Sequence, residues 1–348
     1  MSKSRKAYRI AKAGNIKNLK LVSEDIKEPS KGEVQVEIHS IGLNFADIFA
    51  ILGLYGATPK GSFVPGLEYS GIIISLGEGI EKFKIGDKVM GITRFGAYTS
   101  HINIDADYIV PLPEKWSFEE GAAYLVQSLT AYYGMVHLGR LKKGDCVLIH
   151  SAAGGVGLMA NRIAKIFDAY TIGTVSSESK IEILKQEGYN DWIIRDKNFK
   201  NKLHIALNNR DLDIVMECIG GNVFKAGYNA LAAQGRLINY GSARYGDNSN
   251  SPNWIRLAYM YLTRPKIDPQ KMIESNKSIM GFNLIWLYQQ KELMHQILKE
   301  MNALKLQAPK VGHIFEFDDM YKAIKLFQSG KTQGKVVINV NEDLKEKL

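Results

Sequence analysis

The sequence predicts a two-domain α/β protein, with one β-rich domain and one domain built on a doubly wound parallel sheet. Its 348 residues exceed the usual length of a single domain, so two hydrophobic cores are expected. From about residue 128 to 283, short apolar strands alternate with helical patterns, which is typical of βαβ units. Elsewhere, short apolar runs broken by glycine and proline favour irregular β structure. We expect residues 1–127 and 284–348 to form the β-rich domain and residues 128–283 the parallel-sheet domain.

The composition excludes several classes of protein. Hydrophobic residues make up 45% of the chain and charged residues 23%, which indicates a globular protein. No apolar run approaches the roughly 20 residues that cross a bilayer, so no membrane span is expected. The net charge is +9, but the lysines are scattered and no nucleic-acid-binding motif accompanies them, so no nucleic-acid partner is expected. The start of the chain lacks an apolar secretory signal and only Cys146 and Cys218 occur, which predicts a cytoplasmic location.

The first candidate site is a glycine turn that follows an apolar strand. The strand Val147-Leu148-Ile149-His150 leads into SAAGGVG and then into the helical run LMANRIAKIF. A helix that begins on glycines offers bare backbone amides and close backbone approach to a pyrophosphate. Because strand, turn and helix occur in this order within a βαβ series, dinucleotide binding is favoured over a purely structural turn. The residues predicted to bind the cofactor here are Ala153, Gly154, Gly155, Val156 and Gly157.

The next strand end indicates which dinucleotide binds. An acidic side chain at this place would hold the ribose hydroxyls of NAD, but the strand from Tyr170 to Val175 is followed by Ser-Ser-Glu-Ser-Lys. Hydroxyl groups and cations suit a 2′-phosphate, so NADPH is the predicted cofactor. The predicted phosphate-binding residues are Ser176, Ser177, Lys180 and Arg195. Alternatively, Lys180 lies in an exposed first helical turn that Glu178 caps.

Two further strands of the parallel-sheet domain end in candidate binding residues. Ligands of open α/β sheets bind at the carboxyl ends of the strands. The fourth and fifth strands end there in Ile219 and Gly220 and in Tyr240, Gly241 and Ser242. We therefore expect these five residues to contact the cofactor.

A series of motifs occurs in a fixed order along nearly the entire chain. They are Asn44-Phe45-Ala46-Asp47, Gly53-Leu54-Tyr55, Pro65-Gly66-Leu67-Glu68, Gly86-Asp87-Lys88-Val89, Ala122-Ala123, Leu129-Thr130-Ala131-Tyr132 and HSAAGGVG. In this order they resemble the zinc-free quinone oxidoreductase branch of the medium-chain dehydrogenase/reductase superfamily. The segments GYNALAAQGRLINYG, IMGFNL and GKVVINV are most similar to the vesicle amine transport protein-like group of that branch. The resemblance implies a GroES-like catalytic domain and a Rossmann nucleotide-binding domain.

The resemblance also implies roles for residues near the nicotinamide. Asn44 and Tyr55 would bind or orient the acceptor oxygen, and Phe49 stands where quinone oxidoreductases often have a tyrosine. The other positions that approach the nicotinamide in relatives are Gln127, Thr130, Phe282, Asn283 and Leu284. Structural alternatives remain open: Asn44 ties down a turn, Tyr55 is a wall of the pocket, and Phe282 and Leu284 belong to the core.

Zinc is not expected. Zinc-dependent members of the superfamily carry cysteine at the position of Asn44 and histidine at that of Leu67, and neither replacement binds zinc in that manner. Catalytic zinc requires three nitrogen, sulfur or carboxylate ligands and the structural site requires four thiolates, which this sequence does not supply at those positions.

Together these features predict an NADPH-dependent, zinc-independent oxidoreductase that transfers hydride to a quinone or an α,β-unsaturated carbonyl. The resemblance further implies a homodimer. The alternative is a lipid- or membrane-associated binding protein that retains the nucleotide-binding fold. Peripheral membrane contact would then involve the amphipathic aromatic segment from Asn253 to Arg264, although packing of this helix on the nucleotide-binding domain is the simpler interpretation.

Overall fold

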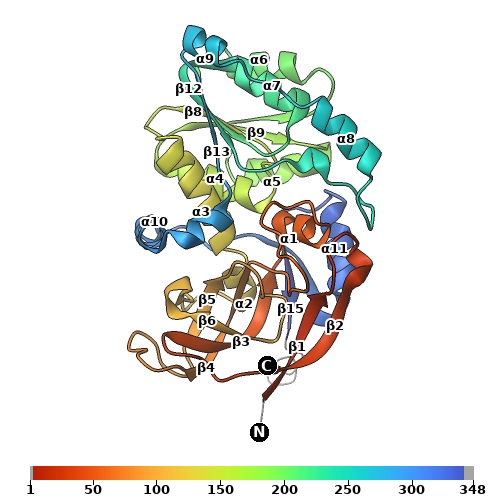
Figure 1. Ribbon diagram of the computed structural model, residues 1–348. Helices are drawn as coiled ribbons and strands as arrows, with labels where there is room; N and C mark the ends of the chain where they lie inside the picture. The colour runs from red at the N-terminus through yellow and green to blue at the C-terminus, as the bar shows by residue number, and fades with distance from the viewer. Residues whose placement is uncertain (1–2, 341–348) are drawn as a thin grey trace. The chain divides into compact units, whose positions relative to one another are not determined.

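The computed structural model describes residues 3–340, which form two compact units (Figure 1). The first, unit 1, contains the described residues up to 126, residues 247–253 and residues from 308 onward. The second, unit 2, contains residues 127–246 and 254–307.

Among the described residues, unit 1 is built on a two-stranded and a seven-stranded sheet. The two-stranded sheet pairs β1 (Lys3–Ile10) with β2 (Leu19–Ile26) in antiparallel orientation. The strands of the larger sheet are β3 (Glu33–Gly42), β4 (Glu68–Leu76), β5 (Lys88–Ile92), β6 (His101–Asp105), β7 (Ile109–Pro111), β14 (Val311–Glu316) and β15 (Lys335–Asn339). They follow the order β14-β15-β3-β4-β5-β7, with β6 paired to β3. This sheet confirms the prediction of a β-rich domain.

Helices close the core of unit 1. They are α1 (Phe45–Ile51), α2 (Phe118–Ala122) and α11 (Met320–Gln328), with single 3₁₀ turns at η1 (Ile16–Asn18), η2 (Ala106–Tyr108) and η7 (Phe317–Asp319). Helix α11 buries Met320, Ala323, Ile324 and Phe327, a spacing that places all four on one helical face. On β3, the alternate residues Val34, Val36 and Ile38 are fully buried in the same core.

Unit 2 contains a six-stranded sheet within the described residues, and all its pairs are parallel. The strands are β8 (Cys146–Ile149), β9 (Tyr170–Val175), β10 (Asp191–Ile194), β11 (Leu212–Glu217), β12 (Leu231–Asn239) and β13 (Ser278–Gly281). Their order is β10-β9-β8-β11-β12-β13, the 3-2-1-4-5-6 order of dinucleotide-binding sheets. The predicted doubly wound parallel sheet is therefore confirmed.

Unit 2 also contains helices and short helical turns (Figure 1). They are α3 (Leu125–Tyr132), which runs into the π-helical turn η3 (Tyr133–Leu138), α4 (Gly155–Ile166), η4 (Glu178–Lys180), α5 (Ile181–Gln186), α6 (Phe199–Leu207), α7 (Gly221–Ala230), η5 (Ala243–Tyr245), α8 (Trp254–Leu262), α9 (Pro269–Ser275), η6 (Leu284–Gln289) and α10 (Lys291–Ala303). Leu148 of β8, Leu203 of α6 and Phe224 of α7 share one buried cluster. Burial of this cluster fixes α6 and α7 against one face of the sheet.

The compact units and the predicted domains divide the chain differently at residue 127, at residues 247–253 and at residues 284–307, and the predicted domain boundaries stay a prediction. Residues 247–253 belong to unit 1, where Asn250 accepts a hydrogen bond from the amide of Ile16 at 2.8 Å and another from the Tyr321 hydroxyl at 2.8 Å. Residues 284–307 belong to unit 2, where Glu300 of α10 accepts a hydrogen bond from Tyr132 at 3.2 Å. The Tyr321–Asn250 and Tyr132–Glu300 bonds join side chains that are far apart in sequence, and the periodicity of the sequence does not reveal such pairs.

Candidate functional site

The glycine turn of unit 2 has the geometry that a pyrophosphate requires. Ser151, directly after β8 and His150, adopts a left-handed conformation with φ of 52°, and α4 begins four residues later. A β-carbon added at Gly157 would lie 2.6 Å from the Ser151 carbonyl oxygen and 2.7 Å from the Ala152 carbonyl oxygen. The first turn of α4 therefore packs against the loop backbone at a distance that only glycine allows. A non-glycine residue held in the left-handed region supports a functional role for this turn.

Gln127 of α3 lies directly over the same turn. A β-carbon at Gly155 would lie 1.6 Å from Gln127 Oε1, so the two residues are in close contact. The Gln127 side chain is buried, and its Nε2 has no hydrogen-bond partner within residues 3–340. A buried amide donor without a partner beside the helix N-terminus fits a bound cofactor group that accepts this hydrogen bond. The structure thus brings Gln127 to the glycine turn, whereas its approach to the nicotinamide, which the resemblance implies, stays a prediction.

The predicted phosphate-binding residues lie at the ends of β9 and β10. Ser176 and Ser177 follow β9, and the Ser177 hydroxyl lies 2.9 Å from that of Ser179. Lys180 ends the 3₁₀ turn η4, and Arg195 directly follows β10. Burial and the nearby Arg195 guanidinium lower the pKa of Lys180. Two cations held close to each other favour a strong anion between or beside them.

Arg195 is held by hydrogen bonds to the neighbouring strand β9. Its NH1 donates hydrogen bonds to the Thr174 hydroxyl at 2.8 Å and to the Thr174 carbonyl oxygen at 3.0 Å. Across the described part of the chain, no carboxylate lies within ion-pair distance of Arg195. Its charge is therefore available to a bound anion.

The ends of β11, β12 and β13 carry the other predicted contacts of unit 2. A β-carbon at Gly220 would lie 3.5 Å from Ser242 Oγ, and one at Gly241 would lie 3.1 Å from Cys218 Cβ. The rings of Tyr240 and Phe282 stack at 6.3 Å. Parallel strands place their carboxyl ends at the same edge, so these residues share the sheet edge with the glycine turn. Thr130 lies in α3, Ile219 directly precedes Gly220, and Asn283 and Leu284 begin η6.

In unit 1, Asn44 belongs to a buried polar cluster. Its Nδ2 donates to Glu68 Oε1 at 3.0 Å and to the Gly42 carbonyl oxygen at 3.2 Å, while its Oδ1 accepts from Lys335 Nζ at 2.8 Å. Lys335 Nζ also pairs with Glu68 Oε1, and both side chains are almost completely buried. Because both Asn44 N–H groups already donate, one of these bonds must be exchanged before Asn44 can bind an acceptor oxygen. Its predicted role stays a prediction.

Asp47 forms the second half of this cluster. Its Oδ2 accepts hydrogen bonds from the Asn44 amide at 2.8 Å and from the Tyr98 hydroxyl at 3.0 Å. Its Oδ1 is buried without a partner within residues 3–340. Burial, which outweighs these hydrogen bonds, raises the pKa of Asp47 to about 7.

The remaining predicted residues of unit 1 lie close to Asn44 in sequence. Phe49 is on α1, where its ring lies 6.5 Å from that of Phe45. Tyr55 is partly buried against the core of unit 1, and its carbonyl oxygen accepts a hydrogen bond from the Thr58 hydroxyl at 2.6 Å. The roles of Phe49 and Tyr55 toward a cofactor or substrate stay predictions.

Residues 3–340 hold neither a metal-binding cluster nor a membrane-spanning helix. That range contains no cluster of three or more histidine, cysteine, aspartate or glutamate side chains able to hold a metal ion. None of its helices combines the length and the apolar character needed to cross a bilayer.

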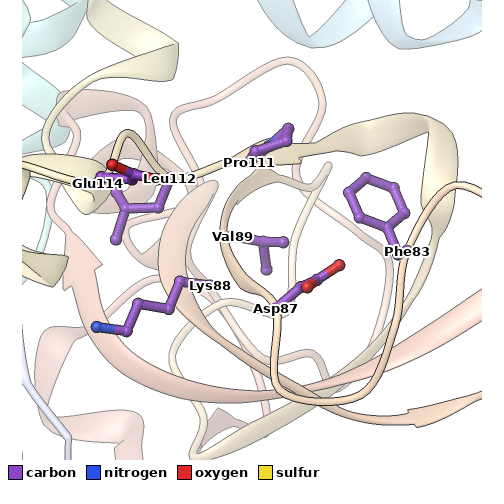
Figure 2. Close-up of a pocket in the computed structure, with 7 residues that line it drawn as sticks. All are labelled: Phe83, Asp87, Lys88, Val89, Pro111, Leu112 and Glu114. Carbon is purple, nitrogen blue, oxygen red and sulfur yellow. The ribbon is translucent and has the colours of Figure 1, made fainter.

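A separate hollow of about 500 Å³ lies beside β5 and β7 in unit 1. Figure 2 shows the side chains that line it: Phe83, Asp87, Lys88, Val89, Pro111, Leu112 and Glu114. None of them is a predicted site residue, and the Asp87 carboxylate already accepts the Lys84 amide at 2.9 Å. This hollow is therefore not the candidate site.

Sequence reasoning missed two groups of buried polar residues. One comprises Thr174, His150 and Glu217, which lie beside Arg195 at the sheet edge. The other is the pair of Glu68 and Lys335 that engages Asn44. A polar residue inside or directly after an apolar strand, as in VLIH and LDIVME, is the signal that points to the first group.

Two family models and one curated relative identify the family. A model described as "Alcohol dehydrogenase GroES-like domain" matches residues 30–114, and one described as "Zinc-binding dehydrogenase" matches residues 155–300. The human synaptic vesicle membrane protein VAT-1 homolog is 31% identical over 314 residues, which cover 89% of this chain and 79% of that protein. The chain belongs to the medium-chain dehydrogenase/reductase superfamily.

Solved structures of this superfamily have the same fold. A CurK enoyl reductase is 27% identical, with a TM-score of 0.82, and the match covers 97% of this chain and 99% of that chain. The Escherichia coli quinone oxidoreductase complexed with NADPH is 25% identical, with a TM-score of 0.82, and the match covers 97% of this chain and 100% of that chain. The predicted family, its GroES-like domain and its Rossmann sheet are confirmed. The protein is an NAD(P)-dependent oxidoreductase of this superfamily.

Proposed function

We propose that this protein is an NADPH-dependent, zinc-independent oxidoreductase that transfers hydride to a quinone or an α,β-unsaturated carbonyl. The observation that carries the proposal is the pair of cations, Lys180 and Arg195, on the sheet edge that also holds the glycine turn. A carboxylate at this place would instead favour NAD. The two structural relatives support the proposal, since one is a quinone oxidoreductase complexed with NADPH and the other an enoyl reductase.

The proposal assigns residues of unit 2 to each part of the cofactor. Ser176, Ser177, Lys180 and Arg195 would hold the 2′-phosphate, and the amides that begin α4 would hold the pyrophosphate. Gln127 Nε2 would donate its hydrogen bond to a cofactor oxygen near Gly155. Bound NADPH would supply the hydride. Tyr55, and Asn44 after exchange of one of its hydrogen bonds, would orient the acceptor oxygen, while solvent would provide the proton.

Calorimetric titration tests the cofactor assignment. Lys180→Ala and Arg195→Ala should each weaken NADPH binding by about tenfold or more, because each removes a charge-assisted hydrogen bond. NADH, which lacks the 2′-phosphate, should bind all variants alike. Lys185→Ala is the matched control, because Lys185 lies in the neighbouring helix α5 and its ammonium faces the Trp192 ring instead. Equal wild-type affinity for NADH and NADPH would contradict the assignment.

The substrate class is tested by measuring NADPH oxidation in the presence of each member of a panel of quinones and enones. Tyr55→Phe should then lower turnover of the best acceptor by roughly twofold to tenfold, the effect of one neutral hydrogen bond, with NADPH affinity nearly unchanged. Unchanged turnover would make Tyr55 a wall of the pocket rather than a catalytic residue.

The second candidate is a lipid- or membrane-associated binding protein. Helix α8 favours it, because its Trp254, Ile255 and Leu262 side chains are 67%, 87% and 72% exposed and Arg264 adjoins them. Flotation with liposomes that contain anionic lipid, with and without NADPH, tests this function. If the wild-type protein stays in the soluble fraction, and Trp254→Ser does the same, this function is contradicted.

The quaternary structure and location belong to the same proposal. Strand β13 is the last strand on one side of the described sheet, so a second copy could extend the sheet there and form the homodimer that the family resemblance implies. Light scattering should give twice the mass of one chain. The two free cysteines, Cys146 and Cys218, fit a reducing cytoplasmic location.

A further inference from the structure

Four polar side chains meet at the edge of the parallel sheet of unit 2. Arg195 follows β10, Thr174 lies in β9, His150 follows β8 and Glu217 ends β11. The strand order β10-β9-β8-β11 makes these four positions neighbours although up to 67 residues separate them. Thr174, His150 and Glu217 are each fully buried. Buried polar groups are costly unless they are hydrogen-bonded, so the bonds that Thr174 makes to Arg195 and His150 fix the positions of these side chains.

Hydrogen bonds join the first three side chains of this row, and a charge contact that lacks hydrogen-bond geometry joins the third to the fourth. Arg195 NH1 lies 2.8 Å from Thr174 Oγ1, which lies 2.8 Å from His150 Nδ1. His150 Nε2 in turn lies 3.3 Å from Glu217 Oε2. Glu217 Oε1 accepts the amides of Ile219 and, at 2.7 Å, Gly220, which lie in the predicted cofactor-binding turn.

The chemistry of these groups determines which atom donates each hydrogen bond of the row. The Arg195 guanidinium can only donate, so Thr174 Oγ1 accepts from it and directs its own proton to His150 Nδ1. Burial and Arg195 lower the pKa of His150 to about 3, so the ring is neutral and carries its one proton on Nε2, facing the Glu217 carboxylate. The opposite tautomer would leave the Thr174 hydroxyl proton buried without an acceptor and would point a nitrogen lone pair at the carboxylate.

We propose that Thr174 and His150 are positioning residues that determine the preference for NADPH by holding the Arg195 guanidinium in place through the hydrogen bonds from Arg195 to Thr174 and from Thr174 to His150. Neither residue needs to touch the cofactor. Arg195 uses one terminal nitrogen on Thr174, which leaves its remaining N–H groups to meet a phosphate. The inference rests on the proposed function, because it assumes that Arg195 binds the 2′-phosphate.

Binding of adenosine 2′,5′-bisphosphate and of 5′-AMP, measured by calorimetry together with NADPH and NADH, tests the proposal without any turnover. Thr174→Val should weaken adenosine 2′,5′-bisphosphate and NADPH by about tenfold and change 5′-AMP and NADH by less than about twofold. Thr174→Ser, which retains the hydroxyl, should restore wild-type discrimination. Thr171→Val is the matched control, because Thr171 is a fully buried threonine of the same strand that bonds Asn161 instead; it should leave the discrimination unchanged.

The tautomer of His150 gives a second measurement that requires no variant to fold. Nitrogen-15 NMR of the wild-type protein should show a neutral ring protonated on Nε2. Protonation of His150 on Nδ1 would overturn the proposal. So would a Thr174→Val variant that loses as much affinity for 5′-AMP and NADH as for adenosine 2′,5′-bisphosphate and NADPH, or one that loses no affinity for any of them. Equal affinity of the wild-type protein for NADPH and NADH would instead overturn the proposed cofactor. In that case the tautomer of His150 would still show whether Thr174 donates its hydrogen bond to His150 Nδ1.

Discussion

Gly157 is a residue at which one methyl group decides the geometry of the candidate site. A β-carbon there would approach two backbone oxygens, of Ser151 and Ala152, to 2.6 and 2.7 Å. Gly157→Ala should therefore displace the turn, lower the free energy of unfolding by about 1–3 kcal/mol and weaken NADPH at least tenfold. Gly56→Ala is the control, because its β-carbon would meet no atom within 4 Å. Thermal unfolding measures the change in stability and calorimetry the change in NADPH affinity. Equal losses of stability and affinity in Gly157→Ala and Gly56→Ala would contradict this account.

Asp47 predicts a pH dependence of stability. Burial raises its pKa to about 7 in the folded protein, whereas the unfolded chain has the ordinary value near 4. Between these values the folded state binds more protons than the unfolded state, so this carboxyl makes stability fall as pH rises from about 4 to about 7. Above pH 7 both states are ionised and the contribution is constant.

Asp47→Asn should remove this dependence. The free energy of unfolding of the wild type, minus that of Asp47→Asn, should fall over that window by at most about 1.4 kcal/mol per pH unit, the limit for one proton. Denaturant titrations at several pH values measure it. A difference that rises with pH would show that Asp47 is ionised throughout.

At the scale of elements, the Lys335–Glu68 ion pair connects three of them. Lys335 belongs to β15, Glu68 to β4, and Asn44, which bonds both side chains, precedes α1. Lys335→Met would leave the Glu68 carboxylate buried without its cation. We expect a loss of about 3–5 kcal/mol in the free energy of unfolding.

The double variant Lys335→Met/Glu68→Gln separates the ion pair from packing. Removal of the unpaired charge should recover part of the loss, and chemical denaturation of all three proteins gives the comparison. A double variant less stable than Lys335→Met alone would indicate that Glu68 contributes through its hydrogen bond to Val126 instead.

The whole molecule is expected to contain no stoichiometric zinc. The family resemblance implies that Asn44 and Leu67 stand where zinc-dependent members have ligands, and the Lys335 ammonium lies 2.8 Å from Asn44 Oδ1. A cation already at this place repels a divalent metal ion. Elemental analysis of protein purified from zinc-containing medium should find far less than one zinc per chain. One zinc that resists chelation and is required for turnover would contradict the prediction.

The order of patterns along the chain was sufficient to predict the architecture. The β-rich runs, the βαβ rhythm and the strand, glycine turn and helix from Val147 onward are local, because each depends on residues adjacent in sequence. The motif order then identified the family, which two family models confirm. The units differ from the predicted boundaries where single polar contacts, such as that of Glu300 with Tyr132, join distant segments.

The sequence by itself determined the fold class and the family, and it predicts the edge of the sheet at which a nucleotide would bind. Only the tertiary structure decided the partners of the side chains there. Lys335 is 291 residues from Asn44, and Arg195, Thr174, His150 and Glu217 come from four different strand ends. Sequence spacing encodes which way a strand faces, but neighbours across a parallel sheet are set by the order of its strands, which arises only when helices and strands pack into one core.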